Sequence, residues 1–381
     1  MKEFFRIKDW WGSKAALLMG MVYLFTLWFS IPFNKFIWLA LLSITTISGF
    51  ASLGYLFNDL FDIKKDALTS KRNFIAGKSF LPVLFYFFVA FAFLIFPWKF
   101  LPFNFISVLL IAAELLLFLI YAAPPFRLKE KGFAGILTDA LYAHALPVAL
   151  AAYTFALAAD KNISTIPFLL LFLWQMLSGI RNILTHQFED RQQDAASKTK
   201  TFVASFTAAQ FYGVVKYCIA FELIACICFF ISLSISNQAM AVCVGVIFAL
   251  TASAIYLFGT GGVQKMLESK WKYFPNNVFE KWIPATILLL LSFTDIRFFA
   301  LLLLHIAAFN HKVYLELLHH VLLPSRGGLR DSLVQIRIGI RRFFSFIINR
   351  LIYYSFLLFG VDLKKEDSSA LNYLKKQRKH K

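Results

Sequence analysis

Acidic residues are scarce in this sequence. It contains 21 Asp and Glu against 39 Lys and Arg in 381 residues, for a formal net charge of +18. There are only four cysteines, which form no CxxC pair and have no histidines at ligand spacing, so neither a zinc site nor a disulfide framework is indicated. The first thirteen residues carry mixed charge before a long apolar segment, so no cleavable signal peptide is expected.

Apolar residues are abundant instead. They make up 59% of the chain, with 46 Phe, which is too apolar for a soluble domain. Many runs reach the roughly 20 residues needed to cross a bilayer. Because backbone polar groups in lipid must be paired within their own segment, we predict an all-α polytopic membrane protein, a bundle of about nine transmembrane helices. The expected spans are residues 14–33, 36–57, 80–98, 102–122, 135–157, 165–186, 212–235, 238–258 and 283–309.

The basic residues follow this topology. If the N-terminus is cytoplasmic, the inside segments as far as Lys281 hold nineteen Lys and Arg, and the outside loops hold three, Lys35, Lys99 and Lys161. This bias fixes the orientation and predicts a multi-pass protein of the cell (inner) membrane. The basic residues do not form one patch with a base-stacking platform, so no nucleic-acid partner is expected.

We expect two domains, a helical bundle at residues 1–309 and a basic amphipathic extension at residues 310–381. The extension carries fourteen Lys and Arg, yet nine crossings would leave it outside. Three arrangements are open: a re-entrant pair broken near Thr294 to Arg297, a tenth span at residues 343–361, or basic helices along the interface. We favour the interfacial tail, with a disordered end from about Lys364.

Two nine-residue strings, residues 58–66 and 186–194, hold acids at matching spacing. On a helix, residues three and four apart share a face, so the acids within each string repel one another unless a cation binds. The first string follows two crossings and the second follows six, which places both at the cytoplasmic face. Their register suggests a weak internal repeat of two helical halves.

Carboxylate and amide oxygens are hard ligands suited to Mg²⁺, which takes its remaining ligands from water and substrate phosphates. We therefore predict that the two strings face one another and bridge one diphosphate through Mg²⁺. The alternative is that these acids solvate a loop and pair with Lys64, Lys65 and Arg191; the repeated spacing on one face favours the metal site. The predicted metal ligands are Asn58, Asp59, Asp62, Asp66, Asp190 and Asp194.

Several cations near these strings are candidates for holding a multiply charged leaving group. Each of them also fits positive-inside topology, and Tyr121, at the membrane boundary, also fits an aromatic belt. The predicted substrate-binding residues of this kind are Lys71, Arg72, Tyr121, Arg127, Lys129, Lys198 and Lys200.

Ionisable residues inside predicted spans are costly, and each is a functional candidate: Glu114, Asp139, His144, Arg181, Glu222, Asp295 and Arg297. Asp139 and Arg181 lie within about two helical turns of an inside loop. We include Arg181 and its neighbour Asn182 among the substrate-binding candidates. The alternative is an interhelical ion pair, for instance of Asp139 with Arg181.

These motifs resemble those of the UbiA superfamily of intramembrane prenyltransferases over most of residues 14–309. The pattern NDxxDxxxD is matched in full by Asn58, Asp59, Asp62 and Asp66, and the second DxxxD by Asp190 and Asp194. The segment from Tyr121 to Lys129 is similar to the family's Tyr-Pro-Pro-Phe-Arg-Leu-Lys type of loop. Three departures are Phe74 for a common proline, Lys198 for a usual glycine, and His186-Gln187 for an Asn-Asp pair.

The resemblance implies an enzyme that binds an allylic prenyl diphosphate with Mg²⁺, ionises its carbon–oxygen bond and delivers the allylic cation to an electron-rich, lipophilic or aromatic acceptor. The catalytic residues would be Asp62, Asp66, Asp190 and Asp194. Alternatives are transfer of a phosphoribosyl or other phosphate-linked group to a lipid carrier, and an ion-coupled transporter. A transporter's acids are expected near the midplane, whereas these fall at the membrane boundary.

Overall fold

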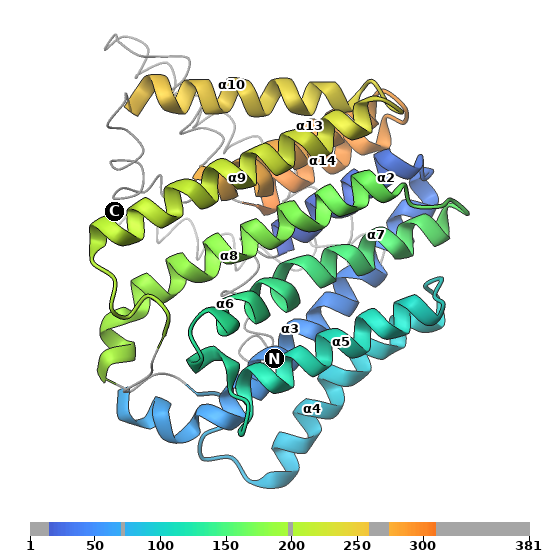
Figure 1. Ribbon diagram of the computed structural model, residues 1–381. Coiled ribbons are helices and arrows are strands. Elements are labelled where there is room, and N and C mark those ends of the chain that lie inside the picture. Colours follow the sequence, from blue (N-terminus) through green and yellow to red (C-terminus); the bar gives the residue numbers. More distant parts are fainter. Residues whose placement is uncertain (1–14, 70–72, 197–200, 259–273, 310–381) are drawn as a thin grey trace, which may run out of the picture. The chain divides into compact units, whose positions relative to one another are not determined.

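The computed structural model describes residues 15–69, 73–196, 201–258 and 274–309 (Figure 1). They belong to the first of two compact units, Met1–Leu315. The second unit, Glu316–Lys381, lies outside the described residues, as does the whole predicted extension at residues 310–381.

Every regular element in these ranges is a helix, which confirms the predicted all-α fold. The elements in chain order are α2 (Ala16–Phe29), α3 (Phe33–Thr69), α4 (Phe80–Ile95), η2 (Phe96–Lys99), α5 (Phe105–Ala122), η3 (Leu128–Glu130), α6 (Phe133–Ala140), η4 (Leu141–Ala145), α7 (Leu146–Ala158), α8 (Thr165–Ala196), α9 (Ala208–Ser234), α10 (Met240–Phe258), α12 (Phe274–Asn277), η6 (Val278–Trp282), α13 (Ile283–Ser292) and α14 (Arg297–Ala308).

Six of the described helical segments are long and apolar enough to cross a membrane: Phe33–Leu68, Phe80–Lys99, Phe105–Ala122, Phe133–Ala158, Thr165–Gln192 and Ala208–Ser234. Large apolar side chains are exposed on their outer faces. On α4, for example, Phe80 and Leu81 are each 74% exposed and Phe88 is 68% exposed. Such a surface is costly in water and favourable in lipid, so the chain is an integral multi-pass membrane protein.

The long α6–α7 segment is interrupted by a π-helical turn, η4, which ends at Ala145, two residues before Pro147. A second π-helical turn, η6, ends at Trp282, two residues before Pro284. Proline has no backbone N–H to donate to the carbonyl four residues earlier, and local π geometry is one way for a helix to continue past that gap.

Residues 283–309 are not one continuous helix but are broken near Thr294 to Arg297, as in one of the three arrangements that the sequence left open. Helix α13 ends at Ser292 and α14 begins at Arg297, and the two helices pack against each other. Asp295 makes the break: its Oδ1 accepts hydrogen bonds from the backbone N–H and the Nε of Arg297, both at 3.0 Å. A carboxylate that takes up unpaired N–H groups at a helix start favours a new helix there. The Asp295–Arg297 pair is therefore structural.

Two lysines show which helix ends meet. Lys35, at the start of α3, donates to the carbonyl of Ala158 at the end of α7, and Lys161, just before α8, donates to the carbonyl of Phe29 at 2.9 Å. Cations at helix C-termini satisfy carbonyls that have no intrahelical donor. Helices α3 and α8 thus start at the same end of the bundle.

Both helices then run to the opposite end (Figure 1). At 1.5 Å per residue, Asp62 lies about 44 Å along α3 from Phe33, and Asp190 lies about 38 Å along α8 from Thr165. The hydrocarbon core of a bilayer is about 30 Å thick. Both acidic strings are consequently carried beyond the apolar layer, at similar depth and at the same end, and α3 contacts α8.

Candidate active site

The first acidic string lies on the last turns of α3, where the following segment folds back onto it. Asp59 is 5% exposed, and its Oδ2 accepts a hydrogen bond from the Phe74 N–H at 3.0 Å. Asn73 Nδ2 donates to Asp66 Oδ2 and to the Asp59 carbonyl, each at 2.8 Å. Asn73 Oδ1 accepts from the Ile75 N–H at 3.0 Å, so this side chain ties the segment to α3. Asn73 was not predicted as a site residue, although Asn is a common turn residue.

Asp62 faces the connection between α5 and α6. Its Oδ1 accepts a hydrogen bond from Arg127 Nη2 at 2.6 Å, and its Oδ2 accepts one from Lys129 Nζ. Arg127 has a left-handed backbone, with φ of 40°, and its Nη1 also donates to the Phe61 carbonyl at 3.2 Å. The two predicted substrate-binding cations are therefore held at a predicted metal ligand.

Glu130 organises these cations and was not predicted. Its Oε1 accepts from Arg127 Nε and from Lys65 Nζ, both at 2.5 Å. For Glu130, burial raises the pKa, but the hydrogen bonds from Lys65 and Arg127 outweigh burial and hold the pKa below its usual 4.5. Burial of Lys129 lowers its pKa below the usual 10.5, although Asp62 opposes this. Lys129 thus loses its charge at a lower pH than a free lysine does.

Tyr121 connects this ion network with the interior of the bundle. It is buried at the end of α5, and its ring packs edge to face on Tyr142 of η4, with centroids 5.1 Å apart. The Tyr142 hydroxyl donates to Asp139 Oδ1 at 2.6 Å, and Tyr121 is close enough to interact electrostatically with Asp139 and Asp62. The predicted residues Tyr121 and Asp139 are therefore part of one polar path that leads inward from Asp62.

Arg181 forms an interhelical ion pair, but its partner is Glu222 of α9 and not Asp139. Arg181 Nε donates to Glu222 Oε2 at 2.5 Å and Nη2 donates to Oε1 at 3.0 Å, and both side chains are fully buried. Asn182 Oδ1 accepts from Arg181 Nη1 at 3.0 Å and from Asn276 Nδ2 at 3.1 Å. These predicted substrate-binding residues brace α8 against α9 and α12.

The second acidic string lies near the end of α8 and is fixed there by aromatic packing. Phe188 stacks on Phe211 of α9 with centroids 3.9 Å apart, and the Arg191 guanidinium lies 4.0 Å from the Phe188 ring. Asp190 remains partly exposed, 3.8 Å from His186, and Asp194 is also partly exposed. Phe188 is buried, whereas Asp190 and Asp194 on the same helix are partly exposed. The two carboxylates are therefore accessible at the end of the bundle.

The segment after the second string packs against the start of α6. Phe202 packs on Phe133 at the start of α6, with ring centroids 6.0 Å apart. In the connection between α5 and α6, Lys129 of η3 binds Asp62. Phe133, which begins α6 after this connection, packs on the segment that follows α8. The predicted cations Lys71, Arg72, Lys198 and Lys200 lie outside the described residues.

A metal ion at this end has suitable ligands. In the part of the chain that the structure describes, no group of three or more His, Cys, Asp or Glu side chains is close enough to hold one. Asp59, Asp62 and Asp66 instead accept hydrogen bonds from Phe74, the loop cations and Asn73. The donor set nonetheless fits Mg²⁺, because carboxylate oxygens are the hard ligands that this ion prefers. Asn58, Asp59, Asp62, Asp66, Asp190 and Asp194 are the residues that would hold it.

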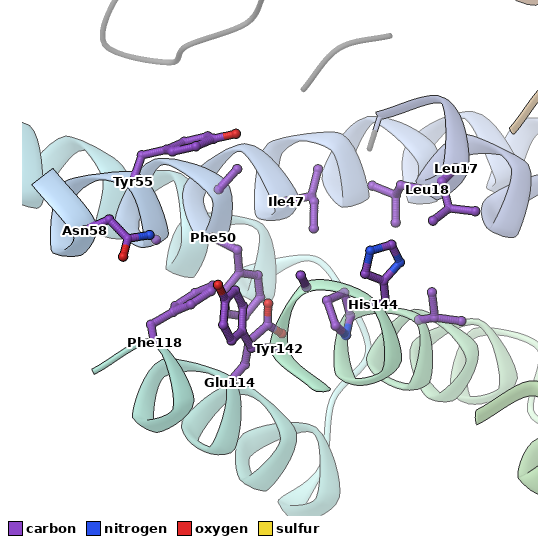
Figure 2. Close-up of a pocket in the computed structure, with 15 residues that line it drawn as sticks. Leu17, Leu18, Ile47, Phe50, Tyr55, Asn58, Glu114, Phe118, Tyr142 and His144 are labelled. Atoms are coloured by element: carbon purple, nitrogen blue, oxygen red, sulfur yellow. The ribbon is translucent and has the colours of Figure 1, made fainter. Parts of the chain in front are cut away.

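An apolar chamber of about 100 Å³ lies next to Asn58. Figure 2 shows its walls from α2, α3, α5 and the η4–α7 turn, with Asn58 at one side and His144 at the other. A smaller cavity of about 30 Å³ shares four lining residues with it and extends to Thr46, Trp98 and Leu101. Asn58 and Thr46 are separated by about 18 Å along α3, so the two cavities follow the helix inward from the acidic end. The lining residues of the chamber are Leu17, Leu18, Ile47, Phe50, Ala51, Gly54, Tyr55, Asn58, Glu114, Phe118, Tyr142, Ala143, His144, Pro147 and Val148.

Solved structures with a similar fold include UbiA homologues from two organisms. A UbiA homologue from Archaeoglobus fulgidus bound to DMAPP and Mg²⁺ matches with a TM-score of 0.51 and 16% identity, over 73% of this chain and 96% of that chain. The same homologue bound to GPP and Mg²⁺ matches with a TM-score of 0.50 and 15% identity over the same shares. An apo UbiA homologue from Aeropyrum pernix K1 matches with a TM-score of 0.50 and 16% identity, over 71% and 94% of the two chains. At these identities, the likeness establishes the fold alone.

No curated protein matches the sequence significantly. The family model of the UbiA prenyltransferase family, however, matches residues 15–274. This range contains both acidic strings, the α5–α6 connection and every residue that lines the chamber. The chain therefore belongs to the UbiA prenyltransferase family.

Proposed function

We propose that this protein is an intramembrane prenyltransferase that transfers the prenyl group of an allylic prenyl diphosphate to an electron-rich, lipophilic acceptor, with Mg²⁺ as cofactor. The reaction would take place at the cytoplasmic end of the bundle in the cell (inner) membrane. The proposal rests on one arrangement of the described residues. Two acidic helix ends lie at the same end of the bundle, and a cation-rich connection and an apolar chamber lie beside them.

The acidic strings and the cations have different roles in binding the diphosphate. Asp62, Asp66, Asp190 and Asp194, with Asn58 and Asp59, would hold Mg²⁺, which supplies positive charge to the leaving diphosphate. Arg127 and Lys129 bind Asp62 and would bind phosphate oxygens in its place when the diphosphate is present. Guanidinium and ammonium groups form charge-assisted hydrogen bonds to carboxylates and to phosphates. Lys71, Arg72, Lys198 and Lys200 are proposed to add to this positive field.

The chamber accounts for the apolar part of the reaction. Its walls are mainly Leu, Ile and Phe side chains, which take up an isoprenoid tail and exclude water from a reactive cation. Phe118, Tyr121 and Tyr142 pack edge to face around the inner end of the polar path, with Phe118 and Tyr142 centroids 4.7 Å apart. Aromatic faces attract cations, so these rings are suited to the site where the allylic cation forms.

The direct test is diphosphate release by the purified protein in lipid nanodiscs. Radiolabelled geranyl diphosphate is incubated with Mg²⁺ and a pool of lipophilic acceptors, with and without EDTA. We expect EDTA-sensitive release of diphosphate together with a labelled, lipid-soluble product. A parallel assay supplies radiolabelled phosphoribosyl diphosphate in place of the geranyl donor. Transfer of its label to lipid without any prenyl transfer would favour the phosphoribosyl alternative, and ion flux without any diphosphate release would favour a transporter; either result would contradict the proposal.

A further inference from the structure

The connection between α5 and α6 lies between two helices, α6 and α3. On the side of α6, a Cβ atom added to Gly135 would lie 2.5 Å from the Leu128 carbonyl oxygen and 3.0 Å from Lys129 Cα. The backbone of η3 therefore packs directly on this glycine, a close approach that a larger residue would prevent. On the side of α3, the connection is attached through charged side chains, so the position of its cations depends on those side chains.

Two of the contacts with α3 involve Asp62, a predicted metal ligand. Arg127 Nη2 and Lys129 Nζ donate to its two carboxylate oxygens, and a metal ion that binds Asp62 would displace them. A further contact involves no predicted metal ligand, because Lys65 Nζ donates to Glu130 Oε1 at 2.5 Å. Lys65 is three residues after Asp62 and shares its face of α3. This ion pair can hold the connection on α3 while Asp62 binds a metal ion.

The same carboxylate oxygen orients the Arg127 guanidinium. Glu130 Oε1 also accepts a hydrogen bond from Arg127 Nε at 2.5 Å, and Arg127 Nη1 donates to the Phe61 carbonyl at 3.2 Å. Because a guanidinium group is planar and rigid, these two bonds fix its plane and direct Nη2 at Asp62. Once Asp62 binds a metal ion, Nη2 would be available to a phosphate oxygen of the same metal complex.

We propose that Glu130 and Lys65 are positioning residues of the diphosphate site, whose ion pair keeps Arg127 and Lys129 at the acidic end of α3 after Asp62 has bound Mg²⁺. This inference rests on the proposed prenyl transfer and adds how its phosphate-binding cations are held in place. Glu130 acts through Arg127 and does not bind the donor itself, because like charges repel and both groups are anions.

Two explanations of Glu130 predict opposite results. If Glu130 only reduced the positive charge near the site, Glu130→Gln would strengthen diphosphate binding, because the change removes a repelling charge. If Glu130 positions Arg127, the same change should weaken diphosphate binding, because Gln cannot form charge-assisted hydrogen bonds to two cations. The side chains of Lys65 and Glu130 are 31% and 24% exposed, and ion pairs of this kind add little to stability, so the variants should fold.

Binding of inorganic diphosphate tests the proposal without turnover. Calorimetry of the purified protein in nanodiscs, in the presence of Mg²⁺, gives the dissociation constant after the signal of empty nanodiscs is subtracted. We expect Glu130→Gln to bind diphosphate about tenfold more weakly than the wild type, the value of a charge-assisted hydrogen bond. Glu130→Asp keeps the charge and should retain part of this affinity.

The double variant tests whether Lys65 acts through Glu130. Lys65→Met alone should weaken diphosphate binding, but it should have little further effect in the Glu130→Gln protein, because the ion pair is already lost there. If the two effects add, Lys65 acts through its own charge and is not a positioning residue.

Metal affinity distinguishes positioning from a general loss of structure. In the absence of diphosphate, Glu130→Gln should bind Mn²⁺ as tightly as the wild type or more tightly, because less firmly held cations compete less for Asp62. Distortion of the acidic end would weaken both ligands. Weaker Mn²⁺ binding in parallel with weaker diphosphate binding would therefore overturn the proposal.

Glu189 supplies the matched control, since it is an exposed carboxylate beside Asp190 at the same end of the bundle. Glu189→Gln removes one negative charge and should leave diphosphate affinity unchanged or slightly increase it. Equal weakening in Glu189→Gln and Glu130→Gln would overturn the role of Glu130.

The same measurement separates this inference from the proposed function. If Glu130→Gln binds diphosphate as tightly as the wild type or more tightly, the inference is overturned and prenyl transfer still stands. If the wild type binds no diphosphate in the presence of Mg²⁺, the proposed function fails, and the inference fails with it.

Discussion

Asp62 and Arg127, 65 residues apart in sequence, are joined by a hydrogen bond of 2.6 Å between Oδ1 and Nη2. Because Lys129 holds the second oxygen of the same carboxylate, both Asp62 oxygens are engaged by cations. A divalent cation that binds Asp62 must compete with these two side chains. The ion network therefore couples metal binding to release of the cations, which become available to the diphosphate.

The first prediction concerns this competition. Lys129→Met removes the charge and keeps most of the side-chain length, so Asp62 should bind a divalent cation more tightly in the absence of donor. We expect an affinity gain of roughly twofold to fivefold, the value of a partly exposed ion pair. Binding of Mn²⁺, followed by electron paramagnetic resonance, measures it directly.

The control for this prediction removes the same charge at the other end of the bundle. Lys161→Met takes away a lysine that donates to the Phe29 carbonyl, and Mn²⁺ affinity should remain that of the wild type. A Lys129→Met protein with unchanged or weaker Mn²⁺ affinity would contradict a competition at Asp62.

The second prediction concerns pH. Burial lowers the pKa of Lys129 below 10.5, so in the folded protein its charge is lost at a lower pH than in a free lysine. If this charge binds the diphosphate, kcat/KM for the donor should fall as pH rises through this lowered pKa. Lys129→Arg stays charged over the same range and should retain kcat/KM to higher pH. Measurements of kcat/KM between about pH 7 and 10.5 test this. If kcat/KM falls identically with rising pH in the wild type and in Lys129→Arg, the role of Lys129 is excluded.

The third prediction concerns the second acidic string. Asp190→Asn removes one proposed metal ligand without a change in size and should lower prenyl transfer at least about 100-fold, as the loss of a charge-stabilising group commonly does. The protein should remain folded, because Asp190 is partly exposed and its neighbour Phe188 keeps α8 stacked on α9. Activity assays and thermal unfolding in detergent are both measured.

Asp160→Asn is the matched control for this prediction. Asp160 is exposed at the opposite end of the bundle and has φ of 54°, a conformation that Asn also tolerates. This variant should have wild-type activity.

The sequence predicted the helical bundle and the placement of the acids because both depend on local patterns. Long apolar runs specify helices in lipid, and an even number of runs between the two strings puts them on one face. It could not predict pairings between distant residues. Arg181 had several carboxylates available, and only the packing of α8 on α9 selects Glu222.

The sequence left questions open where one side chain overrides a pattern. Residues 283–309 form a largely apolar run, so the break near Thr294 to Arg297 was one of three arrangements, and the structure shows it together with the hydrogen bond from the Arg297 N–H to Asp295 Oδ1. Glu130 and Asn73 were overlooked because neither belongs to a repeated motif, although both organise the acidic end of α3 through side-chain hydrogen bonds. A hydrogen-bond network of this kind depends on the fold and has no fixed spacing in sequence.

The last prediction concerns the buried pair Arg181 and Glu222. Glu222→Leu leaves the Arg181 guanidinium in the interior without its bidentate partner, and breaking a buried pair in this way costs about 3–5 kcal/mol of the free energy of unfolding. Replacing both residues, Arg181→Met with Glu222→Leu, removes both charges and should recover most of this loss, because well-packed apolar side chains replace a buried pair without an unpaired charge. Thermal unfolding in nanodiscs measures the two variants. If the double variant is as unstable as Glu222→Leu, Arg181 makes another essential contact, and its proposed role as a brace between α8 and α9 is insufficient.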